Sequence, residues 1–328
     1  MTKKGRLLTG YRPTGKLHIG HYVGNMQNMI RMQEEHECFF FIADWHALTT
    51  KYKDPHALKE DIREMVIGWI ALGLDPKKCI IYRQSDLPAI AELHLYLSMV
   101  TPMGWLERNP TYKEQLKELG AKLVYTYGFI GYPVLQAADI LIMHADMVPV
   151  GEDQLPHLEL TREIARRFNN YYDDYMKEPE AILSETPRVL GTDGRKMSKS
   201  YGNAIYLSDS PEEIKKKVRK MITDPARMRA HDPGHPEVCS VFALHQQFSM
   251  EMVADIDKQC REGTRTCTDC KDMLAQRLAD KFNDFRESRE EYLKIPGFVE
   301  DILEGGLHHA RPVAEETLHE VRRRMNIE

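Results

Sequence analysis

Apolar segments alternate with helical segments between Arg6 and Asp86, and this alternation most constrains the fold. Three short runs, RLLTG, CFFFIADWHALT and KCIIYRQSD, are apolar enough to be buried strands. Between them, apolar residues recur at helical spacing, first from about His18 and then after Asp54, which can cap a helix with Pro55 in its first turn. Strands alternating with helices predict an α/β fold, in which helices cover a parallel sheet.

The remaining sequence predicts two domains. Helices dominate from about 87 to 131, another begins near Pro133, and MVPV followed by GEDQLPHLELTREIARRFNN predicts one more strand and helix. Beyond Ser208 the segments are charged and helical, with no convincing strand. A chain of 328 residues is long for a single core. We therefore expect an α/β domain over 1–207 and an all-helical domain over 208–328, whose last helix can pack back on the first.

Composition narrows the setting of the protein. The formal charge is −5, which excludes a protein that coats nucleic acid through bulk positive charge. The start, MTKKGRLLTG, has no apolar stretch of signal-peptide length, and no segment approaches the roughly 18 apolar residues of a membrane span. We expect a cytoplasmic protein with no membrane partner. In that setting, six cysteines argue against a disulfide framework.

The stretch YRPTGKLHIGHYVGN leads from the first predicted strand into a helix. Free backbone N–H groups and the helix dipole make such a junction an anion site, and its glycines let a nucleotide approach closely. His18 and His21 share one helix face and can donate to phosphate oxygens. The spacing matches neither the dinucleotide fingerprint nor the Walker loop. Taken alone, the stretch also suits a plain helix cap with two surface histidines.

A second cationic loop, KMSKS, combines two lysines and two hydroxyls that suit a departing pyrophosphate. HIGH near the N-terminus together with KMSKS resembles the signature of class I aminoacyl-tRNA synthetases. The segments YPVLQAADIL and VPVGEDQ resemble the tryptophanyl-tRNA synthetase subgroup more than its tyrosyl relatives. The resemblance runs from about Arg6 to the C-terminus and is strongest before Ser208.

This resemblance implies a Rossmann-like nucleotide-binding domain and a helical anticodon-binding domain. It also implies a tryptophan–tRNA ligase that uses ATP and Mg²⁺ to form an aminoacyl adenylate from L-tryptophan, then charges tRNA(Trp). Neither step needs a protein nucleophile, because positioning and charge stabilisation carry the reaction. A homodimer is implied, and the helical segment of about 87–131 is the expected dimer face.

The resemblance also assigns site residues. The catalytic groups are His18, His21, Lys196 and Lys199. The ATP site comprises Arg12, Pro13, Thr14, Gly20, His21, Gly151, Glu152, Asp153, Val189, Lys196, Met197, Ser198, Lys199 and Ser200. The tryptophan site comprises Asp139, Tyr132, Gln136, Gln154 and His46, of which His46 suits a plain strand-end histidine equally well.

Asp139 lies within an apolar helical segment, AADILIM. Indole carries one N–H donor and no acceptor, so a selective pocket needs a buried acceptor in an otherwise apolar slot. A site built around such a hydrogen bond discriminates by about 10⁴-fold or more. Without the family resemblance, a helical aspartate paired with a neighbouring arginine is as good an interpretation.

Four cysteines in the predicted helical domain, Cys239, Cys260, Cys267 and Cys270, are separated by 20, 6 and 2 residues. Their spacing allows either tetrahedral Zn²⁺ or an iron–sulfur cluster. It resembles the motif by which a bacterial subset of tryptophanyl-tRNA synthetases holds a 4Fe-4S cluster, although the first gap is two residues shorter. We expect the cluster, with Zn²⁺ as the alternative and Cys239 as the least secure ligand.

Basic runs at 215–220, at Arg227 and Arg229, and at 322–324 are candidate phosphate contacts for tRNA. Unstacked anticodon bases are expected near Arg265 and Asp269. Three alternatives stay open on the sequence: a tyrosine-specific relative, a small nucleotidyltransferase, and a non-catalytic RNA-binding relative. The first is disfavoured by Asp139, the second by the helical C-terminal region, and the third by intact histidines and lysines in both motifs.

Overall fold

In the computed structural model, which describes residues 4–110, 113, 126–183 and 189–328, a five-stranded parallel sheet has the order β3-β2-β1-β4-β5. Its strands are β1 (Arg6–Tyr11), β2 (Glu37–Ile42), β3 (Cys79–Arg83), β4 (Met147–Val150) and β5 (Glu180–Leu183). Leu8 pairs with Phe39, and Phe40 pairs with Ile81. The order reverses at β1, which lies between β2 and β4, and parallel sheets bind ligands at such a point. The predicted α/β class with a Rossmann-like sheet is confirmed.

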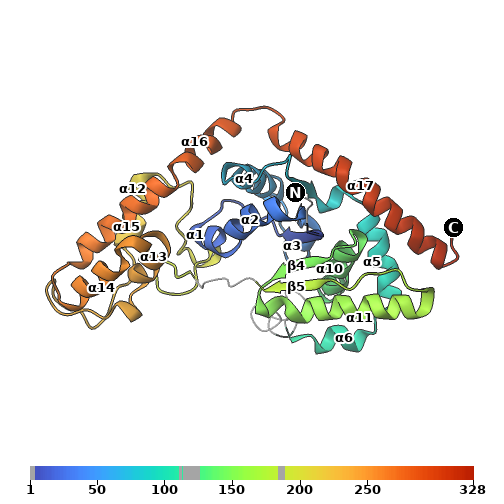
Figure 1. The fold of residues 1–328 in the computed structure, drawn as a ribbon, viewed down its shortest axis with the longest axis horizontal. Helices are drawn as coiled ribbons and strands as arrows, with labels where there is room; N and C mark the ends of the chain where they lie inside the picture. Colours follow the sequence, from blue (N-terminus) through green and yellow to red (C-terminus); the bar gives the residue numbers. More distant parts are fainter. Residues whose placement is uncertain (1–3, 111–112, 114–125, 184–188) are drawn as a thin grey trace.

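Helices follow most strands. They are α1 (Ile19–His21), a π-helical turn (Tyr22–Met26), α2 (Gln27–Glu35), α3 (Asp44–Lys51), α4 (Leu58–Ala71), α5 (Ala89–Val100), α6 (Met103–Arg108), α9 (Tyr127–Ile130), α10 (Tyr132–Ile142) and α11 (Leu155–Tyr172). After the KMSKS loop come α12 (Pro211–Arg219), α13 (Ser240–Phe248), α14 (Val253–Arg261), α15 (Cys267–Lys281), α16 (Asn283–Tyr292) and α17 (Phe298–Arg324). Figure 1 shows α12 to α16 beside the sheet and α17 running back along it.

Alternate residues of the central strands enter two hydrophobic cores. Leu7, Phe40 and Ile81 lie in a core shared with α2, α4 and the helices after residue 208. Leu8 and Phe39 lie in a second core shared with α5, α10, α11 and α17. The alternation arises because successive side chains of a strand point to opposite faces. The helical region is therefore packed directly on the α/β region.

The last helix lies against an edge strand. Gly306 of α17 meets the backbone of β3 so closely that a Cβ there would lie 1.8 Å from the carbonyl oxygen of Ile81. Arg322 donates to both carboxylate oxygens of Glu92 on α5, at 2.7 Å each. The end of the chain is thus fixed to the α/β region, so Arg322 pairs with protein rather than standing as a free phosphate contact.

Two sequence expectations about local structure are wrong. The run CFFFIADWHALT is a strand only to Ile42, after which α3 begins at Asp44, an acid in the first helical turn. The following helix, α4, begins at Leu58 rather than at Asp54, and its cap residue is Ala57 with no side-chain hydrogen bond. Within the described residues, no helix is long and apolar enough to cross a membrane.

Candidate active site

The glycine loop leaves β1 at Tyr11 and enters α1 at Ile19. Gly15 has a φ of +80°, a conformation that strongly favours glycine, and a Cβ there would lie 2.5 Å from Oδ1 of Asp61. The rings of His18 and His21 stack at the other end of the loop, with centroids 3.6 Å apart. The two imidazoles lie together as predicted, but His18 precedes the helix in an extended conformation and does not share a helix face with His21.

Burial, with a smaller contribution from His21, lowers the pKa of His18 to about 3, and burial lowers the pKa of His21 to about 4. Both rings are therefore neutral near pH 7. The backbone N–H of His18 donates to Nδ1 of His21 at 3.2 Å. Because Nδ1 accepts, Nε2 of His21 carries the proton and is the donor available to a ligand.

The KMSKS segment begins in the second arm of a short hairpin over 189–197 and ends in a 3-10 turn, Lys199–Tyr201. The N–H of Met197 donates to the carbonyl of Val189 at 2.9 Å, and Leu190 bridges Lys196 in antiparallel fashion. Asn203, which is buried, accepts from the N–H of Ser198 at 2.8 Å and donates to the carbonyl of Lys196 at 3.1 Å. Asn203 thus fixes the backbone on both sides of Met197, while Lys196, Lys199 and Ser200 are exposed.

The two motifs lie against each other. The N–H of Ile19 donates to the carbonyl of Ile205 at 3.0 Å, and a Cβ on Gly20 would lie 3.8 Å from that of Met197. Lys199 donates to the carbonyl of Thr14 at 3.0 Å. Histidines and lysines separated by 175 residues of sequence therefore meet at one place, as expected for two loops that share a phosphate ligand.

Other predicted ATP residues lie at the carboxyl ends of the neighbouring strands β1 and β4. Arg12 and Pro13 follow β1, and Arg12 donates to Oγ1 of Thr50 at 2.5 Å. Burial lowers the pKa of the Arg12 guanidinium. Gly151 and the exposed Glu152 follow β4. The side chain of Asp153 lies outside the described part of the structure.

Asp139 on α10 is fully buried. Its carboxylate accepts two contacts from Nε2 of Gln84, at 2.8 and 3.0 Å, and lies 2.9 Å from Nε2 of His46. Burial raises the pKa of this carboxyl, and the hydrogen bonds from His46 and Gln84 oppose the rise. The expected buried acceptor is present, but its surroundings are not otherwise apolar, because the polar side chains of His46 and Gln84 already hold the carboxylate. A carboxylate has about four lone-pair sites, so one further donor can be accepted.

The ring of Tyr132 lies near that of His46, the histidine that contacts this carboxylate, with ring centroids 6.5 Å apart. The hydroxyl of Tyr132 bonds to Nε2 of His157 at 2.8 Å, and burial raises its pKa. Gln136, one turn before Asp139, and Gln154, just before α11, are half-buried. His46 lies on α3 and not at a strand end.

Sequence reasoning missed four polar residues at this site, Gln84, His157, Asn203 and Asp61. Two of them had a weak signal in the sequence: Gln84 is a polar residue at the end of an apolar run, and Asn203 is a polar residue beside the KMSKS motif. The roles of Asp61 and His157 depend on contacts between distant segments, which the sequence alone does not reveal.

The four cysteines of the helical region line one small pocket with Val241, Phe242 and Ile256. Burial raises the pKa of Cys270 to about 12 and also raises the pKa of Cys239 and Cys260. Nη1 of Arg227 lies 3.7 Å from the sulfur of Cys260. Across the described ranges, no three His, Cys, Asp or Glu side chains are close enough to hold a metal ion as they stand.

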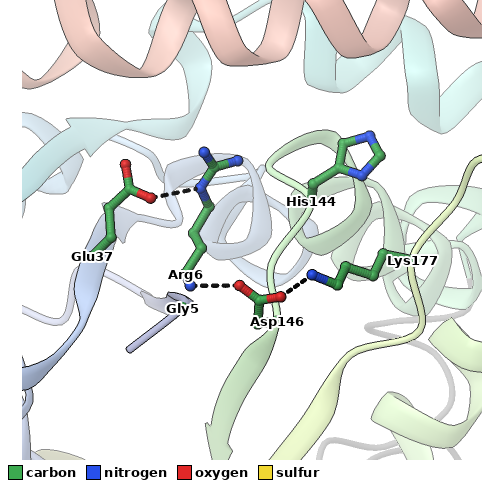
Figure 2. Close-up of a pocket in the computed structure, with 6 residues that line it drawn as sticks. All are labelled: Gly5, Arg6, Glu37, His144, Asp146 and Lys177. Atoms are coloured by element: carbon green, nitrogen blue, oxygen red, sulfur yellow. Dashed lines mark hydrogen bonds and ion pairs between the residues drawn. The ribbon is translucent and has the colours of Figure 1, made fainter. Parts of the chain in front are cut away.

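A larger hollow, of about 560 Å³, lies at the opposite, amino-terminal edge of the sheet (Figure 2). Arg6 pairs there with Glu37, and Lys177 pairs with Asp146. Its four charged side chains thus neutralise one another in pairs, and none of the predicted site residues lines it. This hollow is not the place where the two motifs meet.

Comparisons with known proteins agree with this geometry. Residues 1–283 match the family described as tRNA synthetases class I (W and Y). A tryptophan–tRNA ligase of Thermotoga maritima is 51 % identical over 98 % of this chain and 99 % of its own. One of Aquifex aeolicus is 44 % identical over 98 % of this chain and 100 % of its own.

A solved tryptophanyl-tRNA synthetase of Campylobacter jejuni, complexed with ADP and tryptophan, superimposes with a TM-score of 0.89 at 35 % identity, over 98 % of this chain and 99 % of that one. The parallel sheet, with a histidine loop and a lysine loop meeting beyond it, defines a class I aminoacyl-tRNA synthetase. Within that class, the chain belongs to the tryptophanyl-tRNA synthetase family.

Proposed function

We propose that this chain joins L-tryptophan to tRNA(Trp) in the cytoplasm, using the residues described above. ATP lies against the glycine loop, with its phosphates between the histidine pair and the KMSKS loop, and tryptophan lies beside Asp139. The observation that carries the proposal is the meeting of the two motifs at Thr14 and Lys199. A cationic loop closing on a helix start is a site for a polyphosphate.

The first step breaks the bond between the α- and β-phosphates of ATP. The tryptophan carboxylate attacks the α-phosphorus, and pyrophosphate leaves with the electron pair of the broken bond. Negative charge gathers on phosphate oxygens, so donors fixed in advance lower the barrier. Nε2 of His21, the ring of His18 and the ammonium groups of Lys196 and Lys199 are those donors. Mg²⁺ bound to the phosphates of ATP would neutralise part of this charge.

Tryptophan is selected by its indole N–H. The carboxylate of Asp139, held by Gln84 and His46, keeps acceptor capacity for one more donor. Tyr132, Gln136 and Gln154 border the substrate, with Tyr132 and Gln154 at its ammonium group. A tyrosine hydroxyl can also donate to a carboxylate. The tyrosine-specific alternative is instead disfavoured by the tryptophan–tRNA ligases that match 98 % of this chain.

We assign the helical region after residue 208 to anticodon binding, and the division into 1–207 and 208–328 stays a prediction. The four cysteines fit a 4Fe-4S cluster or Zn²⁺, because all four line one mainly apolar pocket. They come from α14, from α15 and from the residue before α13. A bound metal group supplies a structural cross-link between these segments.

Anaerobic purification with visible absorption and iron and zinc analysis tests this assignment. We expect a brown protein with four irons per chain, lost in Cys267→Ser and retained in Cys38→Ala, which alters a buried cysteine of β2. A colourless protein with one zinc establishes the alternative, and a metal-free protein refutes both.

ATP–pyrophosphate exchange tests the activity itself. We expect exchange that depends on tryptophan and is at least a thousandfold weaker with tyrosine. Exchange with tyrosine alone identifies a tyrosyl enzyme. Exchange with neither amino acid, in a folded protein that binds RNA, identifies a non-catalytic relative.

A further inference from the structure

Asp61, on α4, is a buried carboxylate that the reaction above does not use. Nζ of Lys51 lies 2.9 Å from its Oδ2, and Nζ of Lys199 lies 3.7 Å from its Oδ1. One aspartate therefore joins a lysine at the end of α3 to the second lysine of the KMSKS loop. The sequence gives no sign of this contact, because the three residues come from different segments.

The backbone of the glycine loop closes the same cluster. A Cβ on Gly15 would lie 2.5 Å from Oδ1 of Asp61 and 3.0 Å from Nζ of Lys199. Lys199 also donates to the carbonyl of Thr14 at 3.0 Å. The ammonium of Lys199 is thus held directly against the loop that a nucleotide approaches, although more than half of its side chain is exposed.

We propose that Asp61 is a positioning residue for Lys199, and this proposal rests on the function proposed above. It holds the KMSKS loop against the glycine loop before the nucleotide arrives, which reduces the conformational freedom lost on binding. Two lysines share one carboxylate, so the cluster keeps a net positive charge for the phosphates. When Lys199 turns to phosphate, Lys51 remains paired with Asp61, and the buried carboxylate is never left alone.

Limited trypsin digestion of the ligand-free protein tests the contact without any need for activity. Cleavage after Lys196, followed by mass spectrometry, reports how often the loop opens. We expect Asp61→Asn and Lys199→Met each to speed this cleavage about threefold or more, and the double variant to match the single ones. Glu60→Gln removes an exposed charge from the same helix and is the matched control, with an unchanged rate.

Cleavage of folded Asp61→Asn at the wild-type rate overturns the proposal. Melting temperatures show whether each variant is folded. If Asp61→Asn does not fold, Asp61→Ser takes its place, because Lys199→Met also removes the hydrogen bond to the carbonyl of Thr14 and cannot decide alone.

Exchange kinetics then test the role of the contact. We expect Asp61→Asn to lower kcat/KM for ATP about threefold to tenfold with an unchanged KM for tryptophan, and to have no further effect in the Lys199→Met background. Fully additive effects show that Asp61 acts independently of Lys199 and refute the proposal. A wild-type protein without tryptophan-dependent exchange refutes the proposed function instead, and the trypsin result still decides the contact.

Discussion

His18 and His21 are two uncharged hydrogen-bond donors in a candidate active site that also contains lysines. Their rings stack at 3.6 Å, a distance at which two imidazolium charges would repel strongly. Burial keeps both rings neutral near pH 7. The positive charge of the site therefore comes from the lysines and from Arg12, while the histidines provide oriented, uncharged hydrogen-bond donors.

The stability of the protein should fall as the pH is lowered from about 6.5 towards 4. The pKa of His18 is lowered to about 3 and that of His21 to about 4, so the unfolded state binds protons in this range that the folded state does not. Each histidine contributes at most about 1.4 kcal/mol per pH unit.

Urea unfolding at several pH values measures this slope. His21→Gln should have a shallower slope than the wild type, whereas His56→Gln, an exposed change outside the site, should not. Equal slopes for wild type and His21→Gln contradict the assignment of a buried neutral ring.

Asp139→Asn should lower kcat/KM for tryptophan by about 100-fold or more, because the indole N–H loses its charged acceptor. Binding of ATP should change little. Asp146→Asn, which alters a partly buried aspartate at the opposite edge of the sheet, is the control for the substitution itself. Retention of wild-type activity and selectivity in Asp139→Asn would show that tryptophan does not use this carboxylate.

At the level of single residues, the sequence predicted candidate side chains for the site but not how they pair. The burial of Asp139 followed from its apolar helix, AADILIM. Its partners, His46 and Gln84, are 93 and 55 residues away and reach it because α3 begins, and β3 ends, beside α10. Such contacts depend on the strand order, which local patterns do not specify.

Helix α17 meets β3 at Gly306, and this contact predicts opposite effects for two adjacent glycines. A Cβ on Gly306 would lie 1.8 Å from the carbonyl oxygen of Ile81, whereas a Cβ on Gly305 would have nothing within 4 Å. Gly306→Ala should therefore destabilise the protein by about 2 kcal/mol or more. Gly305→Ala should stabilise it by up to about 1 kcal/mol through helix propensity.

Chemical unfolding of the two variants measures these differences in free energy. Because the substitutions are identical and adjacent, helix propensity cancels in the comparison. Equal stabilities would mean that α17 does not approach β3 this closely.

At the level of elements, the strands with strongly apolar sequences were predicted from the sequence, whereas β5 and α3 were missed. Buried runs such as LLT and FFF indicate strands by composition alone. β5 went unnoticed because its four residues, EAIL, are half-buried or exposed, and it forms by pairing with β4. α3 was missed because the apolar run continues past Ile42 without a break, and only Asp44 marks the change to a helix.

For the whole molecule, we propose that a homodimer forms through α5, α6 and α9. Leu95 and Met99, one turn apart on α5, are 52 and 66 % exposed, and Met103 and Tyr127 are 51 and 70 % exposed. Exposed large apolar side chains gathered on these helices favour an interface here. The rest of the expected dimer segment, 111–112 and 114–125, lies outside the described residues.

Met99→Arg should convert a dimer into a monomer at micromolar concentration, because a charge replaces the most exposed apolar side chain that α5 contributes to this face. Light scattering after size-exclusion chromatography measures the mass. Met250→Arg changes a residue that is 76 % exposed in the helical region, and it should remain dimeric. A wild-type monomer, or a dimeric Met99→Arg, would contradict the proposed face.

The position of α17 on β3 also has a consequence for biosynthesis. The edge strand leaves the ribosome early, but the helix that covers its backbone is made last. A nascent chain therefore carries an uncovered strand edge, a template for wrong pairing with other chains, through most of its translation. We expect a premature stop codon before residue 298 to yield aggregates rather than a shortened working enzyme.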